Sequence, residues 1–259
     1  MKKVKTKKPT LTVVGAGPGD PELITLKAIK AIKSADVILY DALINEDLLS
    51  YASDHAEMIY VGKRKGCYSF QQEQINELIV QRALTKGHVV RLKGGDSFVF
   101  GRGAEEIDYV KPFGLETFVV PGISSALAVP AFQGIPLTKR GASESFWVIT
   151  GTTKSHNMSN DIVLAAKSTA TVVILMGMGK LRQIMDVFTA QGKAKTAVGI
   201  IQNGTTKDEK FGVGTVDTIC DVVKQQQLSN PAIIVVGDVV KQRVALSSIA
   251  KQVETLKVA

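Results

Sequence analysis

The sequence predicts an α/β protein with mostly parallel strands, arranged as two α/β domains. Short β-branched runs alternate with helical patterns from end to end, which is typical of strands joined by helical crossovers. The chain has 259 residues, of which 45% are hydrophobic and 22% charged. Such a chain can bury a large core or two smaller ones, and its composition excludes disorder as the main state.

Nine segments carry the strand pattern. In the first half they are 10–14, 37–40, 57–61, 88–92 and 117–120, and in the second half 145–150, 171–176, 197–202 and 232–236. Between them, apolar residues recur at helical spacing at Ile75, Leu78 and Ile79. A second stripe comprises Leu181, Ile184, Met185 and Phe188. Gly87 and Gly192 follow these stripes where helix C-terminal stops are expected.

The segment 133–141 interrupts the alternation with two glycines and a proline, so we place a domain boundary near residue 138. The expected organisation is a flexible basic tail at 1–9, an N-terminal α/β domain at 10–138 and a C-terminal α/β domain at 139–259. Five lysines in that tail supply much of the net charge of +8. The remaining surplus fits either a site for polyanionic small molecules or a basic surface that only aids solubility, and it argues weakly for nucleic acid, since the few aromatic residues form no stacking platform.

The composition also argues against a metal site, a disulfide framework and a membrane span. The two cysteines, Cys67 and Cys220, lie far apart, and the three histidines are scattered, so no metal site is expected. No apolar run suits a signal peptide or a membrane span, which favours a cytoplasmic protein.

Glycine-rich loops follow several predicted strands. Residues 15–20 read Gly-Ala-Gly-Pro-Gly-Asp, which lacks the third glycine of a dinucleotide fingerprint, while Pro18 removes an amide donor. Residues 93–103 hold four glycines around Asp96, whose carboxylate could bind ligand hydroxyls, with Phe98 and Val99 as apolar contacts. The alternative for this second loop is a long turn capped by Asp96.

A third loop, 120–126, places Ser124 and Ser125 at a helix start, where they could equally serve as N-caps. Glycines also follow the strands that end near residues 176 and 202. Because ligands bind at the carboxyl ends of strands in α/β sheets, these loops together suggest one shared ligand site.

Candidate acid and base groups also follow strands. Asp41 comes directly after the strand at 37–40, and Lys63 and Arg64 follow the strand at 57–61. Taken alone, Asp41 could be a helix cap, and the two cations a solvated turn. No Ser/His/Asp or Cys/His set is evident, so nucleophilic catalysis has no support.

Taken together and in order, these segments resemble the tetrapyrrole methylase family over nearly the whole chain. The most specific parts are Leu-Tyr-Asp-Ala-Leu at 39–43, Val-Gly-Lys-Arg at 61–64, Val-Arg-Leu-Lys-Gly-Gly-Asp at 90–96 with Phe-Gly-Arg-Gly at 100–103, and Val-Pro-Gly-Ile-Ser-Ser-Ala at 120–126. The resemblance implies two α/β domains, an active site in the trough between them, and a homodimer.

The resemblance also implies S-adenosylmethionine as methyl donor and a tetrapyrrole as substrate. The donor pocket would be lined by Pro18, Gly94, Gly95, Asp96, Val99, Ser124, Ser125, Met176 and Gly204, with Ala232 a further candidate. Asp41 matches the family's proton acceptor and Lys63 its proton donor. A substrate with eight carboxylates would be bound through charge-assisted hydrogen bonds, for which the candidates are Arg64, Lys93, Arg102, Lys139 and Arg140.

Three positions depart from the family pattern: Ser97 replaces a common proline, Tyr68 a common histidine and Lys139 another histidine. The competing functions are a family member acting on a later precorrin, the more remote diphthine synthase and ribosomal RNA ribose methylase, and a nucleotide-binding regulatory module without chemistry. The segment at 61–64 and the Gly-Gly-Asp loop favour an enzyme that methylates the earlier, octacarboxylate tetrapyrrole.

Overall fold

The computed structural model describes residues 8–62 and 70–244. Several positions named above therefore lie outside the described residues: the tail at 1–7, Lys63, Arg64, Cys67 and Tyr68. The chain divides between Ser125 and Ala126 into two compact units, each built on a five-stranded sheet. No helix of the described part is long and apolar enough to cross a membrane.

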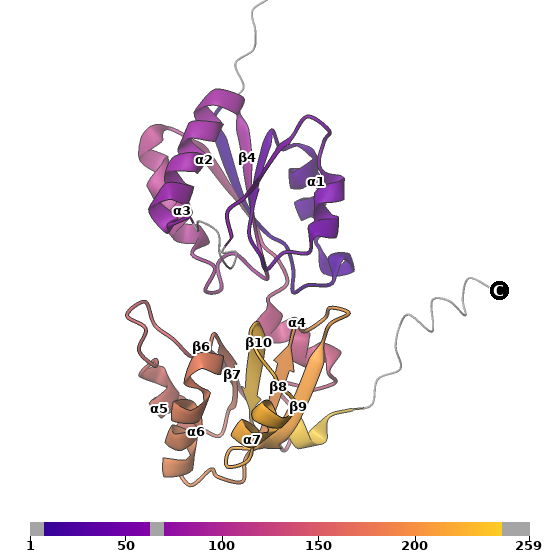
Figure 1. Cartoon of the computed structure of the whole chain (residues 1–259), viewed down its shortest axis with the longest axis vertical. Helices are drawn as coiled ribbons and strands as arrows, with labels where there is room; N and C mark the ends of the chain where they lie inside the picture. The colour runs from indigo at the N-terminus through magenta and orange to yellow at the C-terminus, as the bar shows by residue number, and fades with distance from the viewer. Residues whose placement is uncertain (1–7, 63–69, 245–259) are drawn as a thin grey trace, which may run out of the picture. The chain divides into compact units, whose positions relative to one another are not determined.

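The first unit contains a fully parallel sheet of strand order β3-β2-β4-β1-β5. Its strands are β1 (Thr10–Gly15), β2 (Val37–Tyr40), β3 (Glu57–Tyr60), β4 (His88–Lys93) and β5 (Glu116–Val120). Its helices are α1 (Leu26–Lys33), α2 (Gln72–Lys86) and α3 (Gly103–Val110). Helix α1 covers one face of the sheet, and α2 and α3 cover the other (Figure 1).

Alternation along the central strands supplies a core on each face of this sheet. Leu11 and Val13 pack toward α2 and α3, where Ile75 and Ile79 are buried, whereas Val14 packs on the α1 side. Parallel sheets need both faces covered, and the near-continuous apolar runs of β1 and β2 meet that need. Because all five strands run the same way, their carboxyl ends lie at one edge.

The second unit contains a mixed sheet of order β6-β7-β10-β8-β9. Its strands are β6 (Phe146–Thr150), β7 (Thr171–Leu175), β8 (Ala197–Gln202), β9 (Lys210–Thr215) and β10 (Ala232–Val236). Only β6 and β7 pair in parallel, and the other three pairings are antiparallel. The expectation of mostly parallel strands therefore holds for the first unit and not for the second.

Helices α5 (Asp161–Lys167), α6 (Leu181–Ala190) and α7 (Ile219–Gln225) bury their apolar residues with one face of this sheet. On the other face lie Ala126 and Val129 of α4 (Ser125–Phe132), together with Ile135. These contacts draw the segment from Ala126 onward into the second unit. The boundary thus lies earlier than the expected position near residue 138, because Ala126 and Val129 of α4 are buried with the second sheet.

Candidate functional site

Four loops meet at the carboxyl edge of the first sheet, after β1, β2, β4 and β5. The loops after β1 and β4 are joined directly: the Gly17 amide donates to the Gly95 carbonyl at 3.1 Å, and the Gly95 amide donates to the Gly17 carbonyl at 2.7 Å. A side chain at Gly122, after β5, would place its Cβ 2.3 Å from the Gly95 carbonyl oxygen. The expected convergence of glycine-marked strand ends is present within this unit.

The loop after β2 joins the same group. A Cβ at Gly94 would lie 2.8 Å from the Cβ of Leu43, so only glycine lets the two loops approach this closely. Gly95 adopts a φ of 66°, in the left-handed region that glycine tolerates. Leu43 therefore fills the space beside Gly94, whereas a Cβ at Gly95 would meet nothing closer than the Ser125 amide nitrogen at 3.6 Å.

Asp96 ties these loops together through both of its carboxylate oxygens. Oδ1 accepts from the Phe98 amide at 2.8 Å, and Oδ2 accepts from the Gly122 amide at 3.0 Å. Asp96 therefore does cap a turn, as the alternative interpretation of this loop expected. The hydrogen bond from Gly122 in addition links the loop after β4 to the loop after β5. A carboxylate with two backbone donors still has lone pairs for a ligand.

Large apolar side chains stand exposed on these loops, namely Leu43, Phe98, Val99, Phe100 and Ile123. Exposed apolar groups gathered around bare backbone and a few polar groups are typical of small-molecule sites. Phe100 and Arg102 also adopt left-handed backbone conformations, with φ of 54° and 60°. Strain of this kind in non-glycine residues favours a functional role for the loop that carries them.

Asp41 lies at the end of β2 with its carboxylate held on both sides. Oδ1 accepts from the Leu43 amide at 3.1 Å, and Oδ2 accepts from Nη2 of Arg91 at 3.0 Å. The side chain is 24% exposed, so it remains accessible to a substrate. Sequence reasoning assigned no role to Arg91, whose only signal was a cation between the apolar residues Val90 and Leu92 of the strand.

Lys93 differs from the expectation that it binds a substrate carboxylate. Its side chain is 7% exposed, and its ammonium donates to Oε1 of the buried Glu106 at 2.9 Å. Burial outweighs this attraction and, together with the charge of Arg91, lowers the pKa of Lys93. The geometry thus assigns Lys93 to the interior of the first unit.

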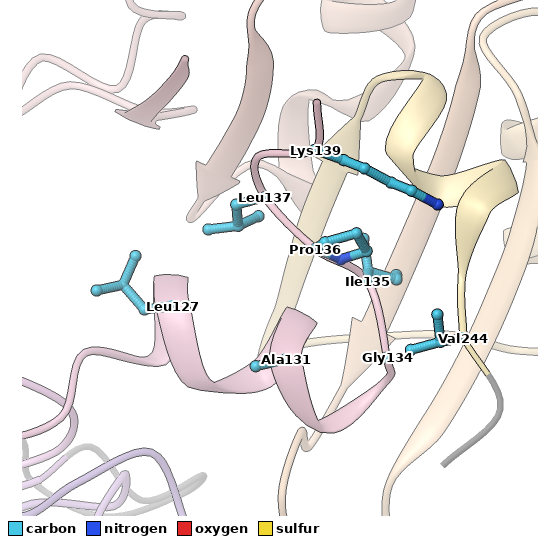
Figure 2. A pocket seen from close by; sticks show the side chains of 8 residues that line it. All are labelled: Leu127, Ala131, Gly134, Ile135, Pro136, Leu137, Lys139 and Val244. Atoms are coloured by element: carbon cyan, nitrogen blue, oxygen red, sulfur yellow. The ribbon is translucent and has the colours of Figure 1, made fainter. Parts of the chain in front are cut away.

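The other predicted substrate-binding cations that the structure describes, Arg102, Lys139 and Arg140, are exposed. Arg102 precedes α3 and pairs with Glu105 at 2.6 Å, and this hydrogen bond raises the pKa of the guanidinium. Lys139 and Arg140 lie in an exposed turn of the second unit, closed by hydrogen bonds between Lys139 and Ser143. Lys139 also borders an apolar pocket of about 490 Å³, to which Val244 contributes from another segment (Figure 2).

The second unit gathers its three candidate donor contacts at one edge of its own sheet. Met176 follows β7, Gly204 follows β8, and Ala232 begins β10, where it pairs with Gln202. Met176 is half exposed with a left-handed φ of 55°, and Thr205, beside Gly204, has a φ of 67°. A left-handed β-branched residue is a backbone outlier, which again favours a functional role for this edge.

Among the described residues, no group of three His, Cys, Asp or Glu side chains could hold a metal ion.

Comparison with known proteins decides the family. Residues 10–220 match the family described as Tetrapyrrole (Corrin/Porphyrin) Methylases. The chain belongs to this family.

Three relatives of this tetrapyrrole methylase indicate where in the family it lies. A uroporphyrinogen-III C-methyltransferase of Methanocaldococcus jannaschii is 48% identical over 88% of this chain and 95% of the relative. The crystal structure of a uroporphyrin-III C-methyltransferase from Thermus thermophilus, complexed with S-adenyl homocysteine, has a TM-score of 0.78 and 34% identity, covering 90% of this chain and 99% of that one. The structure of a cobalt precorrin-4 methyltransferase has a TM-score of 0.80 and 26% identity, covering 89% and 95%.

Proposed function

We propose that this chain is a uroporphyrinogen-III C-methyltransferase, which uses S-adenosylmethionine to methylate uroporphyrinogen III twice and so forms precorrin-2. The observation that carries a small-molecule site is the convergence of four loops at the carboxyl edge of the first sheet, one of which carries the partly exposed Asp41. The substrate assignment is supported by the relatives. Identity is 48% to a uroporphyrinogen-III C-methyltransferase of Methanocaldococcus jannaschii, and among the solved structures it is 34% to a uroporphyrin-III C-methyltransferase and 26% to a cobalt precorrin-4 methyltransferase.

The residues of the proposed donor site fit S-adenosylmethionine. Gly95, which follows Gly94, has no neighbour closer than 3.6 Å at its Cβ position and so admits close contact. Exposed Val99 offers apolar surface, and the Asp96 carboxylate can accept from polar groups of the donor. Pro18, Ser124 and Ser125 complete the proposed contacts of the first unit, and Met176, Gly204 and Ala232 those of the second. When bound, the donor supplies an electrophilic methyl group, so the chain needs no nucleophile of its own.

The residues of the chain then have to align the donor methyl group with the substrate carbon and to transfer protons. Asp41 accepts the proton that the methylated pyrrole must lose, and Lys63 donates a proton during the rearrangement that follows. Arg64, Arg102, Lys139 and Arg140 bind substrate carboxylates. Lys93 is excluded from this set, because its ammonium is buried against Glu106.

The decisive test is anaerobic incubation of the purified protein with uroporphyrinogen III and S-adenosylmethionine, followed by mass spectrometry of the tetrapyrrole. A gain of two methyl groups is expected. No gain, with donor binding intact by calorimetry, would redirect the search to later precorrins. Donor binding itself separates an enzyme from a nucleotide-binding module, which would bind nucleotide and leave S-adenosylmethionine untouched.

The Asp41→Ala variant tests the assignment of the base. Because Asp41 is proposed to remove a proton and not to contact the donor, the variant should bind S-adenosylmethionine normally and lose about a hundredfold or more in turnover. Calorimetry and the methylation assay measure the two quantities separately. Unchanged turnover would remove Asp41 from the mechanism.

We further propose that the enzyme acts as a cytoplasmic homodimer with no nucleic acid or membrane partner, and that its product feeds siroheme or cobalamin synthesis. Light scattering on the eluting protein tests the dimer, for which a mass of twice the 27.8 kDa chain is expected. A mass of one chain would contradict it.

A further inference from the structure

A buried set of charges lies beneath Asp41 in the first unit. Arg91 and Lys93 alternate with apolar residues along β4, on the same face as Val89, which packs toward α2 and α3. On that side Glu106, in the first turn of α3, is 0% exposed. Buried charges are expensive unless they are paired, so this arrangement requires an explanation.

Glu106 is the centre of the set. Its Oε1 accepts from Nε of Arg91 at 3.2 Å, from Nζ of Lys93 at 2.9 Å and from Nε2 of Gln72 at 3.2 Å. Within the described residues its other oxygen, Oε2, is buried without a hydrogen-bond partner. The hydrogen bonds of its carboxylate to described residues thus converge on one oxygen, which faces the strand that carries Arg91.

Arg91 connects Glu106 to Asp41, because its guanidinium contacts both carboxylates. Its Nη1 donates to the Leu92 carbonyl at 2.8 Å and to the Leu39 carbonyl at 3.4 Å, while Nη2 donates to Asp41 at 3.0 Å. A guanidinium is planar, so a group that holds Nε also fixes the direction in which both Nη atoms point. The chain of contacts runs from α3 through Glu106 and Arg91 to the carboxylate.

Charge balance alone would not need this geometry. The four groups, Arg91, Lys93, Glu106 and Asp41, are two cations and two anions, and a buried ion pair can often be replaced by apolar residues without loss of stability. Charge balance does not require that a carboxylate oxygen of Glu106 accept from Nε of Arg91. That contact fixes the plane of the guanidinium and so directs Nη2 toward Asp41.

We propose that Glu106 is a positioning residue for the methylation reaction, fixing the guanidinium of Arg91 and thereby the orientation of the Asp41 carboxylate. The inference rests on the proposed function in one respect, since it takes Asp41 as the proton acceptor.

Two double variants test it, Lys93→Met with Glu106→Gln and Lys93→Met with Glu106→Leu. Both remove one cation and one anion, so Arg91 and Asp41 stay balanced, and they differ in whether an oxygen faces Nε of Arg91. We expect kcat at least about tenfold lower in the leucine variant than in the glutamine variant, at equal affinity for S-adenosylmethionine. Equal kcat in the two would overturn the proposal.

Coupling to Asp41 provides the second readout. If Glu106 acts through Asp41, the difference between the two double variants should disappear in an Asp41→Asn background. A difference that persists there would mean that Glu106 acts by another route. If the leucine variant does not fold, Glu106→Asp replaces it, since it keeps the charge and withdraws the oxygen from Nε; wild-type kcat in that variant would overturn the proposal.

Crystal structures of the double variants separate this proposal from the proposed function, because they need no turnover. The contact of 3.0 Å between Nη2 of Arg91 and Oδ2 of Asp41 should persist in the glutamine variant and be lost in the leucine variant. Retention of the contact in both would overturn the positioning role whichever tetrapyrrole is the substrate. Failure of the wild-type protein to methylate uroporphyrinogen III would instead overturn the proposed function and leave this geometric test in force.

Discussion

At the residue scale, two glycines, Gly15 and Gly122, allow the strand ends of the first sheet to touch. A Cβ at Gly15 would lie 2.5 Å from the Gly122 amide nitrogen, and one at Gly122 would lie 2.3 Å from the Gly95 carbonyl oxygen. The obstructing atoms belong to the backbone, which cannot move aside as the end of a flexible side chain can. Glycine at these positions is therefore a steric requirement of the site.

Gly122→Ala should destabilise the protein by about 1–3 kcal/mol, the usual range for overpacking, and weaken S-adenosylmethionine binding. Gly179→Ala is the matched control, because nothing lies within 4 Å of the added Cβ. Urea unfolding and calorimetry measure the two effects. Equal stability and affinity in the two variants would mean that the loops can separate without loss.

Asp96 makes a second prediction at this scale, since each of its oxygens holds a backbone amide. Asp96→Ala should lower the affinity for S-adenosylmethionine by about tenfold or more, because hydrogen bonds to charged groups contribute about 1.5–3 kcal/mol. Asp96→Asn, which keeps one acceptor oxygen, should fall between that variant and the wild type. Wild-type affinity in Asp96→Ala, by titration calorimetry, would move the donor away from this loop.

At the element scale, the sequence pattern located nine of the ten strands in the described part of the chain, because most of them are β-branched or apolar runs bounded by turn residues. It missed β9, whose alternating Gly212 and Gly214 weaken the strand signal. The structure explains these glycines: a Cβ at Gly212 would lie 2.7 Å from Leu228, and one at Gly214 would lie 2.9 Å from Thr218. Because close packing against β9 requires glycine at these two positions, the strand lacks the β-branched pattern by which strands are recognised in a sequence.

Helix α6 shows the opposite case, in which local pattern suffices. The predicted stripe of Leu181, Ile184, Met185 and Phe188 is confirmed as its buried face, and Phe188 is 1% exposed. Phe188→Ala should destabilise the protein by about 3–5 kcal/mol through cavity formation. Gln183→Ala, on the exposed side of the same helix, should change stability by less than about 0.5 kcal/mol. Urea midpoints that fall equally in both would contradict the assignment of the buried face.

At the scale of the whole molecule, short-range pattern predicted the two α/β domains and the glycine loops, but not the pairing of buried charges. Arg91 lies 50 residues from Asp41 and 15 from Glu106, and only the folded sheet brings them together. Lys93 was misjudged for the same reason, because a lysine beside a glycine loop looks like a ligand contact until its burial is known. The antiparallel pairings of the second sheet likewise depend on topology and not on local composition.

The burial of Lys93 makes a prediction about global stability. Desolvation, followed by the charge of Arg91, lowers its pKa in the folded protein from the ordinary value of 10.5. Between the lowered pKa and 10.5 the unfolded chain binds more protons than the folded one, so the contribution of Lys93 to the free energy of unfolding rises with pH. The wild type should therefore gain stability relative to Lys93→Met as pH rises through that window, as measured by urea unfolding from roughly pH 7 to roughly pH 10. Lys86→Met, at an exposed lysine of α2, gives the control difference. If the wild type lost stability relative to Lys93→Met over the same range, the ammonium would be stabilised by Glu106 more strongly than burial opposes it.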